Sequence, residues 1–407
     1  MQNRTLTFIL AGGVGSRLLP LTLRRSKPAV PFGGKYRIID FTLANCLHSG
    51  LRRVLVLTQY KSHSLHKHLR DGWSIFNPEL GEYITAVPAQ MNYGDHWYEG
   101  TADAVFQNLN LIDRSDADFT LILSGDHIYR MDYEALLRFH KDHGGDVTVA
   151  CIEVAVERAK DAFGVAVTNE QMLIVDYKEK PKQPTPIAAD PNKTLASMGL
   201  YVFPTKLLKQ VLLEDQYNTD SSHDLAKDVL PVLVQNKKVY AYKFGGKKGR
   251  VTQDRYWRDV GTIDAYYKAN MDLLEPVPPL NLYQVDWPIR TYQPQTPPAR
   301  IVPGTSGAEG VFISSMLASG VVVSGGNVRN SVLFEGIFID DRATIDQSIL
   351  FAGVQVGAEA ALRNCIVDKN VKIPPQEQIG YDLTTDRHRF TVTEQGIVVV
   401  PEGFVFG

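Results

Sequence analysis

The chain has 407 residues, of which 44% are hydrophobic and 22% are charged, a composition typical of a folded globular protein. This length predicts about two or three domains, and a formal net charge of −2 provides no overall field that would recruit nucleic acid. Cys46, Cys151 and Cys365 are far apart, which argues against a disulfide scaffold and against a structural zinc site. No apolar run approaches the ~20 residues that cross a bilayer, so we expect no membrane partner and a cytoplasmic location.

The chain up to about residue 275 alternates short apolar runs with helical patterns. We predict strands at 7–11, 54–57, 119–123 and 147–150, and helices at 38–49, 101–113, 132–143 and 223–236. This alternation indicates an α/β domain over residues 1–275, with a Rossmann-like, mainly parallel sheet. Seven prolines between residues 276 and 298 then predict an extended linker, which we place at 276–308.

Apolar residues recur at a spacing of 17 in the remaining part of the chain, residues 309–407. Three interleaved series of this kind describe three short strands per coil, each with one aliphatic side chain pointing inward, so the pattern predicts a parallel β-helix. The series are Val322, Ile339, Val356 and Ile373; Val328, Ile345 and Leu362; and Leu333, Leu350 and Val367, with Ser331, Ser348 and Cys365 in step.

A glycine-rich turn, Leu10–Leu18, follows the first predicted strand. Glycine lets backbone N–H groups approach phosphate oxygens, and the carboxyl end of such a strand is where anionic ligands bind. A tight strand-to-helix turn would explain the glycines equally well, and their spacing matches neither the dinucleotide fingerprint nor the P-loop. Arg17 and Lys27 favour the functional interpretation, because two cations around one loop suit a polyphosphate.

Two aspartates are candidates for a Mg²⁺ site. Asp126 follows the strand at 119–123, and Asp259 lies in the stretch Tyr256–Thr262. Mg²⁺ prefers a few carboxylates together with phosphate oxygens and water, although a strand-end aspartate can also cap a helix. Other polar clusters suggest no chemistry: we interpret His63, His66 and His68 as a polar helix face rather than a zinc site, and His127 as structural.

The block Leu10–Leu18, followed by Lys27-Pro28-Ala29, resembles the signature of nucleotidyltransferases that make nucleotide sugars. The block Phe32–Phe41 narrows this resemblance to bacterial glucose-1-phosphate adenylyltransferases, and the resemblance continues through nearly the whole chain. It implies synthesis of ADP-glucose and pyrophosphate from ATP and α-D-glucose 1-phosphate for glycogen or starch, with Mg²⁺ as cofactor. It also implies a left-handed β-helix, a homotetramer and regulation by anionic metabolites.

The resemblance assigns expected roles to single residues. Arg17, Lys27 and Asp126 would be catalytic, and Asp126 and Asp259 would hold the metal. Arg24 and Arg389 would contribute to an effector site. Glucose 1-phosphate would be bound by Tyr98, Gly164, Glu179, Lys180 and Ser197, and the nucleotide by Gly12, Gly13, Gln59, Gln90, Gly100 and Thr101.

Two alternatives stay open at this point. The chain could be another pyrophosphorylase that makes UDP-, dTDP- or GDP-sugars, although the blocks Phe32–Phe41 and Trp97–Ala104 argue against it. It could also be a non-catalytic regulatory subunit or nucleotide-sugar sensor, which degraded active-site residues would mark. A second, acyl-transfer centre in the β-helix is rejected, because the coils contain no histidine.

Overall fold

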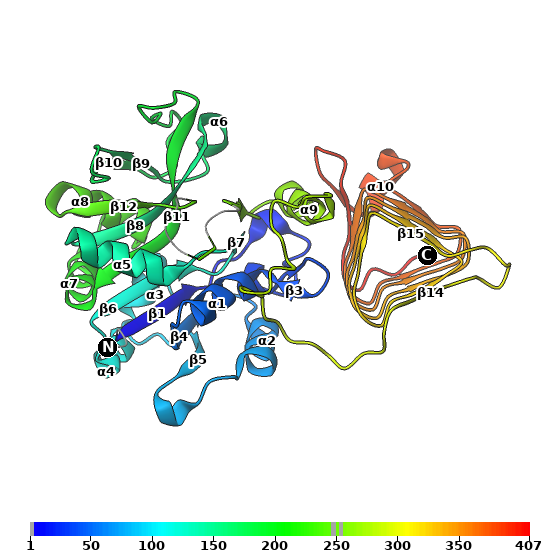
Figure 1. The fold of residues 1–407 in the computed structure, drawn as a ribbon, viewed down its shortest axis with the longest axis horizontal. Helices are drawn as coiled ribbons and strands as arrows, with labels where there is room; N and C mark the ends of the chain where they lie inside the picture. Colours follow the sequence, from blue (N-terminus) through cyan, green and yellow to red (C-terminus); the bar gives the residue numbers. More distant parts are fainter. Residues whose placement is uncertain (1–3, 246–249, 252–254) are drawn as a thin grey trace.

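A nine-stranded mixed sheet organises the first domain (Figure 1). The computed structural model describes residues 4–245, 250–251 and 255–407. Parallel strands lie side by side in the order β5 (Tyr83–Pro88), β4 (Arg53–Thr58), β1 (Thr5–Leu10) and β6 (Phe119–Ser124). The long strand β11 (Lys193–Pro204) then pairs antiparallel with β6. The expected Rossmann-like arrangement is therefore confirmed in its parallel half.

The antiparallel half of the sheet is built around β11. It pairs with β8 (Val147–Ala155), which in turn carries β12 (Val239–Lys243) in parallel. It also pairs with β9 (Val165–Thr168), whose hairpin partner is β10 (Ile174–Lys178). Two short ladders lie outside this sheet: β2 (Pro31–Phe32) with β3 (Tyr36–Arg37), and β7 (His127–Tyr129) with β13 (Trp257–Asp259).

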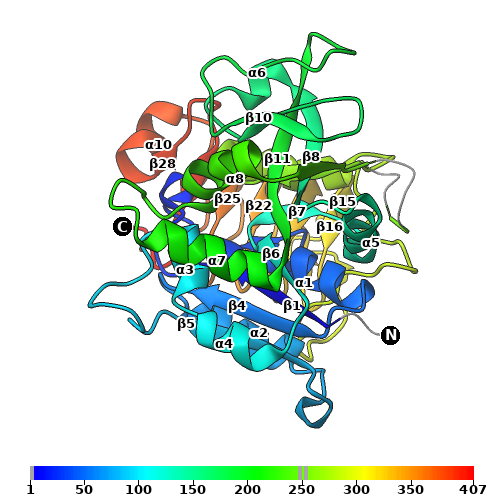
Figure 2. The same ribbon diagram turned by 90° about the vertical axis from the view of Figure 1, so that its left-hand side faces the viewer.

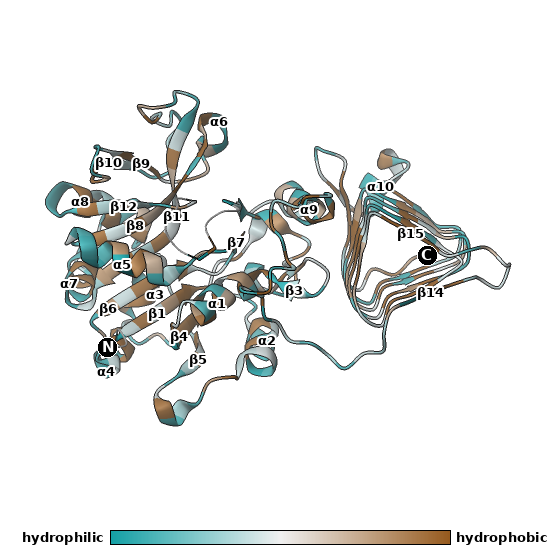
Figure 3. Cartoon of the chain, in the orientation of Figure 1, coloured by the Kyte–Doolittle hydropathy of each residue, from teal (hydrophilic) through white to brown (hydrophobic). Residues whose placement is uncertain are grey.

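Both faces of the central strands are covered, which explains their nearly continuous apolar sequences (Figure 3). In β1, Leu6 and Phe8 belong to one hydrophobic core, whereas Ile9 belongs to the core on the other face. Figure 2 shows α3 and α7 in front of the sheet and the β-helix behind it. None of the described helices is both long and apolar enough to cross a membrane.

The helices mostly follow the sequence prediction, with one interruption. The expected helix 101–113 divides into α3 (Thr101–Phe106) and α4 (Leu109–Ser115), because Asn108 leaves helical geometry and its side-chain amide donates to the carbonyl of Ala104 at 2.8 Å. The remaining helices are α1 (Ile38–His48), α2 (His63–Trp73), α5 (Tyr133–His143), α6 (Val156–Ala159), α7 (Thr205–Gln216), α8 (Leu230–Asn236, after a π-helical turn at Leu225–Val229), α9 (Ile263–Met271) and α10 (Leu383–Arg389).

The linker runs along the first domain and is held against it by a buried tryptophan and by hydrogen bonds. Trp287 is only 1% exposed, and its indole N–H donates to Asn45 at 3.1 Å. The Arg130 guanidinium donates to the carbonyl of Asn281, and Arg290 donates to the carbonyl of Gly72. The first strand of the β-helix, β14, begins at Arg300, inside the stretch expected to be linker.

The second domain is a left-handed parallel β-helix whose coils stack into a triangular prism (Figure 1). Its three sides are parallel sheets, the third of which ends in an antiparallel pair. The strands of the first side are β14 (Arg300–Val302), β17 (Val322–Ser324), β20 (Phe338–Ile339), β23 (Gln355–Val356) and β26 (Lys372–Ile373). Those of the second are β15 (Val311–Ile313), β18 (Asn327–Arg329), β21 (Thr344–Asp346), β24 (Ala361–Arg363) and β27 (Gln378–Ile379). Those of the third are β16 (Met316–Leu317), β19 (Val332–Leu333), β22 (Ile349–Leu350), β25 (Cys365–Val367), β29 (Val398–Val400) and β28 (Thr391–Val392).

Two of the three predicted columns are confirmed by the strand register: Val328–Ile345–Leu362 and Leu333–Leu350–Val367. The remaining column, which was predicted to begin at Val322, begins one residue later. Val323, not Val322, is fully buried and pairs with Ile339, because the turn after β17 is one residue shorter than in the next coil. The small residues form a ladder, in which the Ser331 hydroxyl accepts the N–H of Ser348 at 3.0 Å.

Candidate active site

The two candidate carboxylates converge because of the small β7–β13 ladder. Asp126 follows the end of β6, and His127 begins β7. In the antiparallel register, His127 lies opposite Asp259, so Asp259 is brought beside Asp126. Gly125 between strand and aspartate must be small, since a Cβ there would lie 2.9 Å from a methyl carbon of Ile9.

Lys27 lies between the two carboxylates. Its Nζ donates to Oδ2 of Asp126 and to Oδ1 of Asp259, both at 2.8 Å, and its side chain is only 10% exposed. Burial by itself lowers the pKa of Lys27, but the two aspartates outweigh burial and the pKa is raised. Burial likewise raises the pKa of Asp126, yet Lys27, His127 and the Ser124 hydroxyl bring it well below its usual range. Lys27 and Asp126 therefore both stay ionised at neutral pH.

These carboxylates have the chemistry of a divalent-cation site. Potential ligand atoms of Asp126, His127 and Asp259 all lie within 4.8 Å of one another. Two carboxylate oxygens already hold one positive charge between them, and such hard oxygen donors suit Mg²⁺. The sequence interpretation of His127 as structural omitted its place in this group, although its ring does pack edge-on against Trp257, with centroids 5.0 Å apart.

A cavity of about 740 Å³ opens beside this cluster. The glycine turn forms one wall, and Arg17, Lys27 and Asp126 face it together. The structure thus brings together ten of the predicted site residues on the lining of one cavity: Gly12, Gly13, Arg17, Lys27, Gln59, Tyr98, Gly100, Thr101, Asp126 and Glu179. Asp224 also lines it, and no sequence pattern singled that residue out.

The start of α3 reaches the cavity, but the N–H groups of Ala102 and Asp103 already donate to the carbonyl of His223. Gly100 packs so closely on His223 that a Cβ would lie 2.1 Å from the His223 carbonyl oxygen. That carbonyl accepts the N–H of Ala102 at 2.7 Å, and the Thr101 hydroxyl donates to Asp224 at 3.1 Å. Any contact between a nucleotide and the start of α3 would therefore come from Gly100 and Thr101.

The two glutamines expected at the adenine lie apart. Gln59 lines the cavity, and its amide is bonded twice to the backbone of Tyr98, donating to the carbonyl at 3.2 Å and accepting the N–H at 2.9 Å. Gln90 follows β5, is exposed, and does not occur among the described residues that line the cavity. The Tyr98 hydroxyl accepts a hydrogen bond from Asn108 at 2.9 Å, which fixes its ring.

The predicted sugar-phosphate residues surround Glu179. The Tyr177 hydroxyl donates to Glu179 at 3.0 Å, and Gly164 leaves room for both, since a Cβ on it would lie 1.8 Å from that hydroxyl oxygen. Ser197 lies behind this wall, where its N–H donates to the Gly164 carbonyl at 2.8 Å. Lys180 has a φ of 45°, and its Nζ lies 3.3 Å from Glu179 on a side chain that is 58% exposed.

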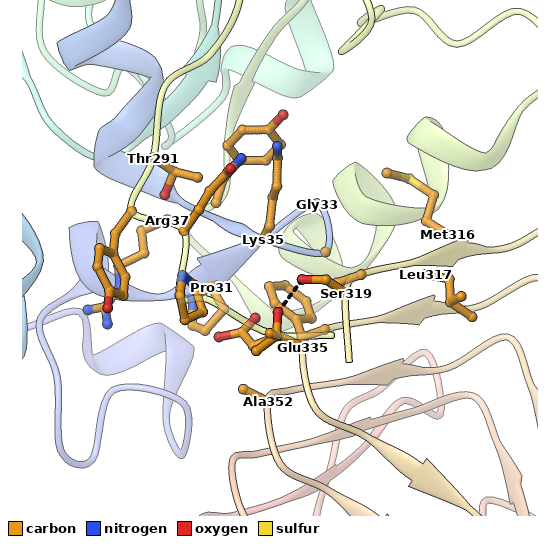
Figure 4. A pocket seen from close by; sticks show the side chains of 18 of the residues that line it. Pro31, Gly33, Lys35, Arg37, Thr291, Met316, Leu317, Ser319, Glu335 and Ala352 are labelled. Carbon is orange, nitrogen blue, oxygen red and sulfur yellow. Dashed lines mark hydrogen bonds between the residues drawn. The ribbon is translucent and has the colours of Figure 1, made fainter. Parts of the chain in front are cut away.

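A second cavity, of about 790 Å³, lies between the two domains (Figure 4). Lys35 and Arg37 line it from the first domain, while Glu335 and Lys369 line it from the β-helix. Burial, together with Arg37 and Arg25, lowers the pKa of Lys369 to about 8. This cavity was not expected from the sequence, because its walls come from segments about 300 residues apart.

The predicted effector residues lie outside that cavity's lining. Arg24 is exposed, with a guanidinium nitrogen 3.5 Å from where a Cβ on Gly403 would be. Arg389 pairs with Glu377 at 2.8 Å and stacks over the ring of Phe406. Two histidines of α2 take separate partners: His66 bonds with Thr58, and His68 bonds with Asp40. His63 is exposed, as a polar helix face requires, but His68 is buried against Asp40 and does not lie on the face expected for it.

Comparison with known proteins adds independent information. A family model described as nucleotidyl transferase matches residues 6–276, and one described as GlmU-like, C-terminal hexapeptide, matches residues 297–400. The chain is 58% identical over 406 residues to a glucose-1-phosphate adenylyltransferase 2 of Vibrio cholerae serotype O1, covering 100% of this chain and 99% of that protein. It is 60% identical to the protein of that name in Vibrio parahaemolyticus, with 100% of both chains covered. It is 48% identical to the glucose-1-phosphate adenylyltransferase of Rhodopirellula baltica, over 99% of this chain and 91% of that protein.

Proposed function

The chain belongs to the glucose-1-phosphate adenylyltransferase family, and we propose that the cavity beside Lys27, Asp126 and Asp259 is where it makes ADP-glucose. The substrates are ATP and α-D-glucose 1-phosphate, and the second product is pyrophosphate. The observation that supports this location is the bridge of Lys27 between two carboxylates beside a glycine turn, on the wall of a cavity large enough for a nucleotide.

The chemistry needs no general base from the protein. A sugar phosphate has a second pKa of about 6, so at pH 7 it is mostly a dianion and already nucleophilic. Its phosphate oxygen attacks the α-phosphorus of ATP in line, and the bond from that phosphorus to the bridging oxygen breaks with its electron pair leaving on pyrophosphate. Arg17, Lys27 and the loop amides neutralise and position these anions. Asp126 and Asp259 would hold Mg²⁺, which would supply further charge stabilisation at the phosphates.

The remaining residues divide between the two substrates. Glu179 accepts hydrogen bonds from sugar hydroxyls, and Lys180 meets the sugar phosphate, with Tyr98, Gly164 and Ser197 shaping that side. Thr101 lies on the nucleotide side together with Gly12, Gly13, Gly100, Gln59 and Gln90. For the two glutamines this assignment requires a rearrangement: Gln59 would have to release Tyr98, and Gln90 would have to move toward the cavity.

The test is Mg²⁺-dependent pyrophosphate release from glucose 1-phosphate, with ATP, UTP, dTTP, GTP and CTP compared at equal concentration. We expect strong preference for ATP. Preference for another nucleotide would keep the mechanism but overturn the adenine assignment. Absence of release with every nucleotide, from folded protein, would favour the regulatory-subunit alternative. A regulatory subunit would have lost active-site residues, whereas this chain retains Arg17, Lys27, Asp126, Lys180 and Asp259.

Regulation and assembly also belong to this proposal. We place an anionic metabolite effector near Arg24 and Arg389, because both cations lie against the C-terminal segment 401–407. Reversing the charge with Arg24→Glu should blunt the response of the rate to phosphorylated metabolites. An unchanged response to every metabolite would remove this site. The homotetramer and the cytoplasmic location stay predictions, the former testable by sedimentation.

A further inference from the structure

The space between Asp126 and Asp259 is filled by a positive charge that belongs to the chain. The Lys27 ammonium makes two hydrogen bonds of equal length, one to an oxygen of each carboxylate. A divalent ion shared by the same two oxygens would have to occupy nearly the same position. The ammonium and the ion cannot both be there, because two positive charges at contact repel strongly in a site of low water content.

Lys27 has another place to go. Its backbone is fixed in a short 3₁₀ turn (Lys27–Ala29) by Pro28 and by buried neighbours, so only the side chain can move. The stem runs past the glycine turn: Lys27 Cβ lies 3.2 Å from where a Cβ on Gly15 would be, and Gly15 has a φ of 66°. A rotation of the four-carbon stem therefore carries the ammonium toward the loop where the phosphates are proposed to bind.

We propose that the Lys27 ammonium closes the metal site in the free enzyme and opens it when the nucleotide phosphates bind the ammonium instead. This rests on the proposed metal site at Asp126 and Asp259. Without nucleotide, a divalent ion must displace a buried ammonium that would be left without an anionic partner. With nucleotide, the phosphates supply that partner. The ion and the nucleotide therefore bind cooperatively, and each strengthens the other by the same factor.

The test compares binding of Mn²⁺ alone to the wild type and to Lys27→Met, followed by the electron paramagnetic resonance signal of free Mn²⁺. The methionine keeps the apolar stem but removes the charge, so the two aspartates face each other without a cation. We expect Mn²⁺ without nucleotide to bind K27M at least tenfold more tightly than the wild type. Mn²⁺ should also raise the melting temperature of K27M more than that of the wild type. Equal or weaker binding to K27M would overturn the proposal.

Two further variants locate the effect. Lys61→Met removes a lysine whose Nζ donates to the Thr22 carbonyl at 3.0 Å rather than to the two carboxylates, and so controls for net charge. If it tightens Mn²⁺ binding as much as K27M does, the effect is general electrostatics and the proposal fails. Adding Asp259→Asn to K27M should abolish the gain; a gain that persists would place the ion elsewhere and also overturn it. Lys27→Gln serves as the second variant if circular dichroism shows K27M to be unfolded, with the same expected direction.

A separate measurement distinguishes this proposal from the metal site on which it rests. Binding of Mn²⁺ together with a non-hydrolysable ATP analogue is compared in the wild type and in Asp259→Asn. Weaker binding to D259N supports the metal site, whatever K27M shows. Unchanged binding to D259N would remove the metal site itself, and the competition with it.

Discussion

The Nη2 atom of Arg25 lies 2.9 Å from Oδ1 of Asp368, a residue 343 positions further along the chain. The second guanidinium nitrogen reaches the other carboxylate oxygen at 3.2 Å, and both side chains are almost fully buried. Arg25 is two residues before Lys27, and Asp368 directly follows β25 of the β-helix. The ion pair thus connects the loop that carries Lys27 to the second domain.

The first prediction concerns the stability of this connection. Arg25→Met leaves the Asp368 carboxylate buried without its main partner, which costs about 3–5 kcal/mol in comparable buried pairs. We expect a lower melting temperature and a lower denaturation midpoint. Arg24→Met, one residue earlier and exposed, is the matched control and should leave both unchanged. Equal losses in the two variants would show that the pair contributes little to stability.

The second prediction concerns turnover. Asp126→Asn keeps the size of the side chain but removes half of the anionic site, so pyrophosphate release should fall at least ~100-fold while the protein stays folded. Asp176→Asn is the control, because the Asp176 side chain is about half exposed and forms an ion pair with Lys178 rather than with Lys27. Near-normal turnover in D126N would remove Asp126 from the catalytic site.

The third prediction separates the two substrates. Lys180→Ala should raise KM for glucose 1-phosphate about tenfold or more, as loss of a charge-assisted contact predicts, and should leave KM for ATP nearly unchanged. Lys178→Ala removes an exposed lysine two residues earlier, at the end of β10, and should change neither constant. Equal increases for both substrates in K180A would place Lys180 outside the sugar-phosphate site.

The fourth prediction concerns pH. Folding lowers the pKa of Lys369 from 10.5 to about 8, so between these pH values the unfolded chain binds more protons than the folded one. Stability from this residue therefore rises as pH increases from 8 to 10.5. Lys369→Met should be more stable than the wild type at pH 7, on the order of 2 kcal/mol, with the advantage shrinking toward pH 10. Urea unfolding at the two pH values measures it, and an advantage that is constant with pH would contradict it.

The sequence predicted what depends on local periodicity. The apolar strands β1, β4 and β6 and the columns through Ile345 and Leu350 were found because burial on both faces or stacking leaves a regular pattern. Val322 was assigned inward because it lies 17 residues before Ile339. The shortened turn moves the inward position to Val323, and the sequence does not reveal this because both residues are valine. The break at Asn108 was missed because it depends on where one side-chain amide finds an acceptor.

Contacts between distant segments could not be predicted from the sequence. Arg24 and Arg25 are neighbouring arginines that the sequence alone does not distinguish, yet Arg24 is exposed and Arg25 is buried against Asp368. The resemblance placed Lys27 and both aspartates in one site, but only the β7–β13 register shows that a single ammonium joins the carboxylates. Asp224 and His223 reach the cavity region through Gly100, a contact that no spacing signals.

The third side of the prism does not finish on a bare parallel strand. β29 is the last parallel strand, and β28 runs antiparallel along its outer edge. A further coil from another molecule could not pair in parallel with β29, because β28 already occupies that edge. β28 itself is only two residues long and therefore offers little edge for pairing. The third side thereby carries a stop against end-to-end growth into fibres, and trimming residues 391–392 should leave the edge of β29 open to a further strand.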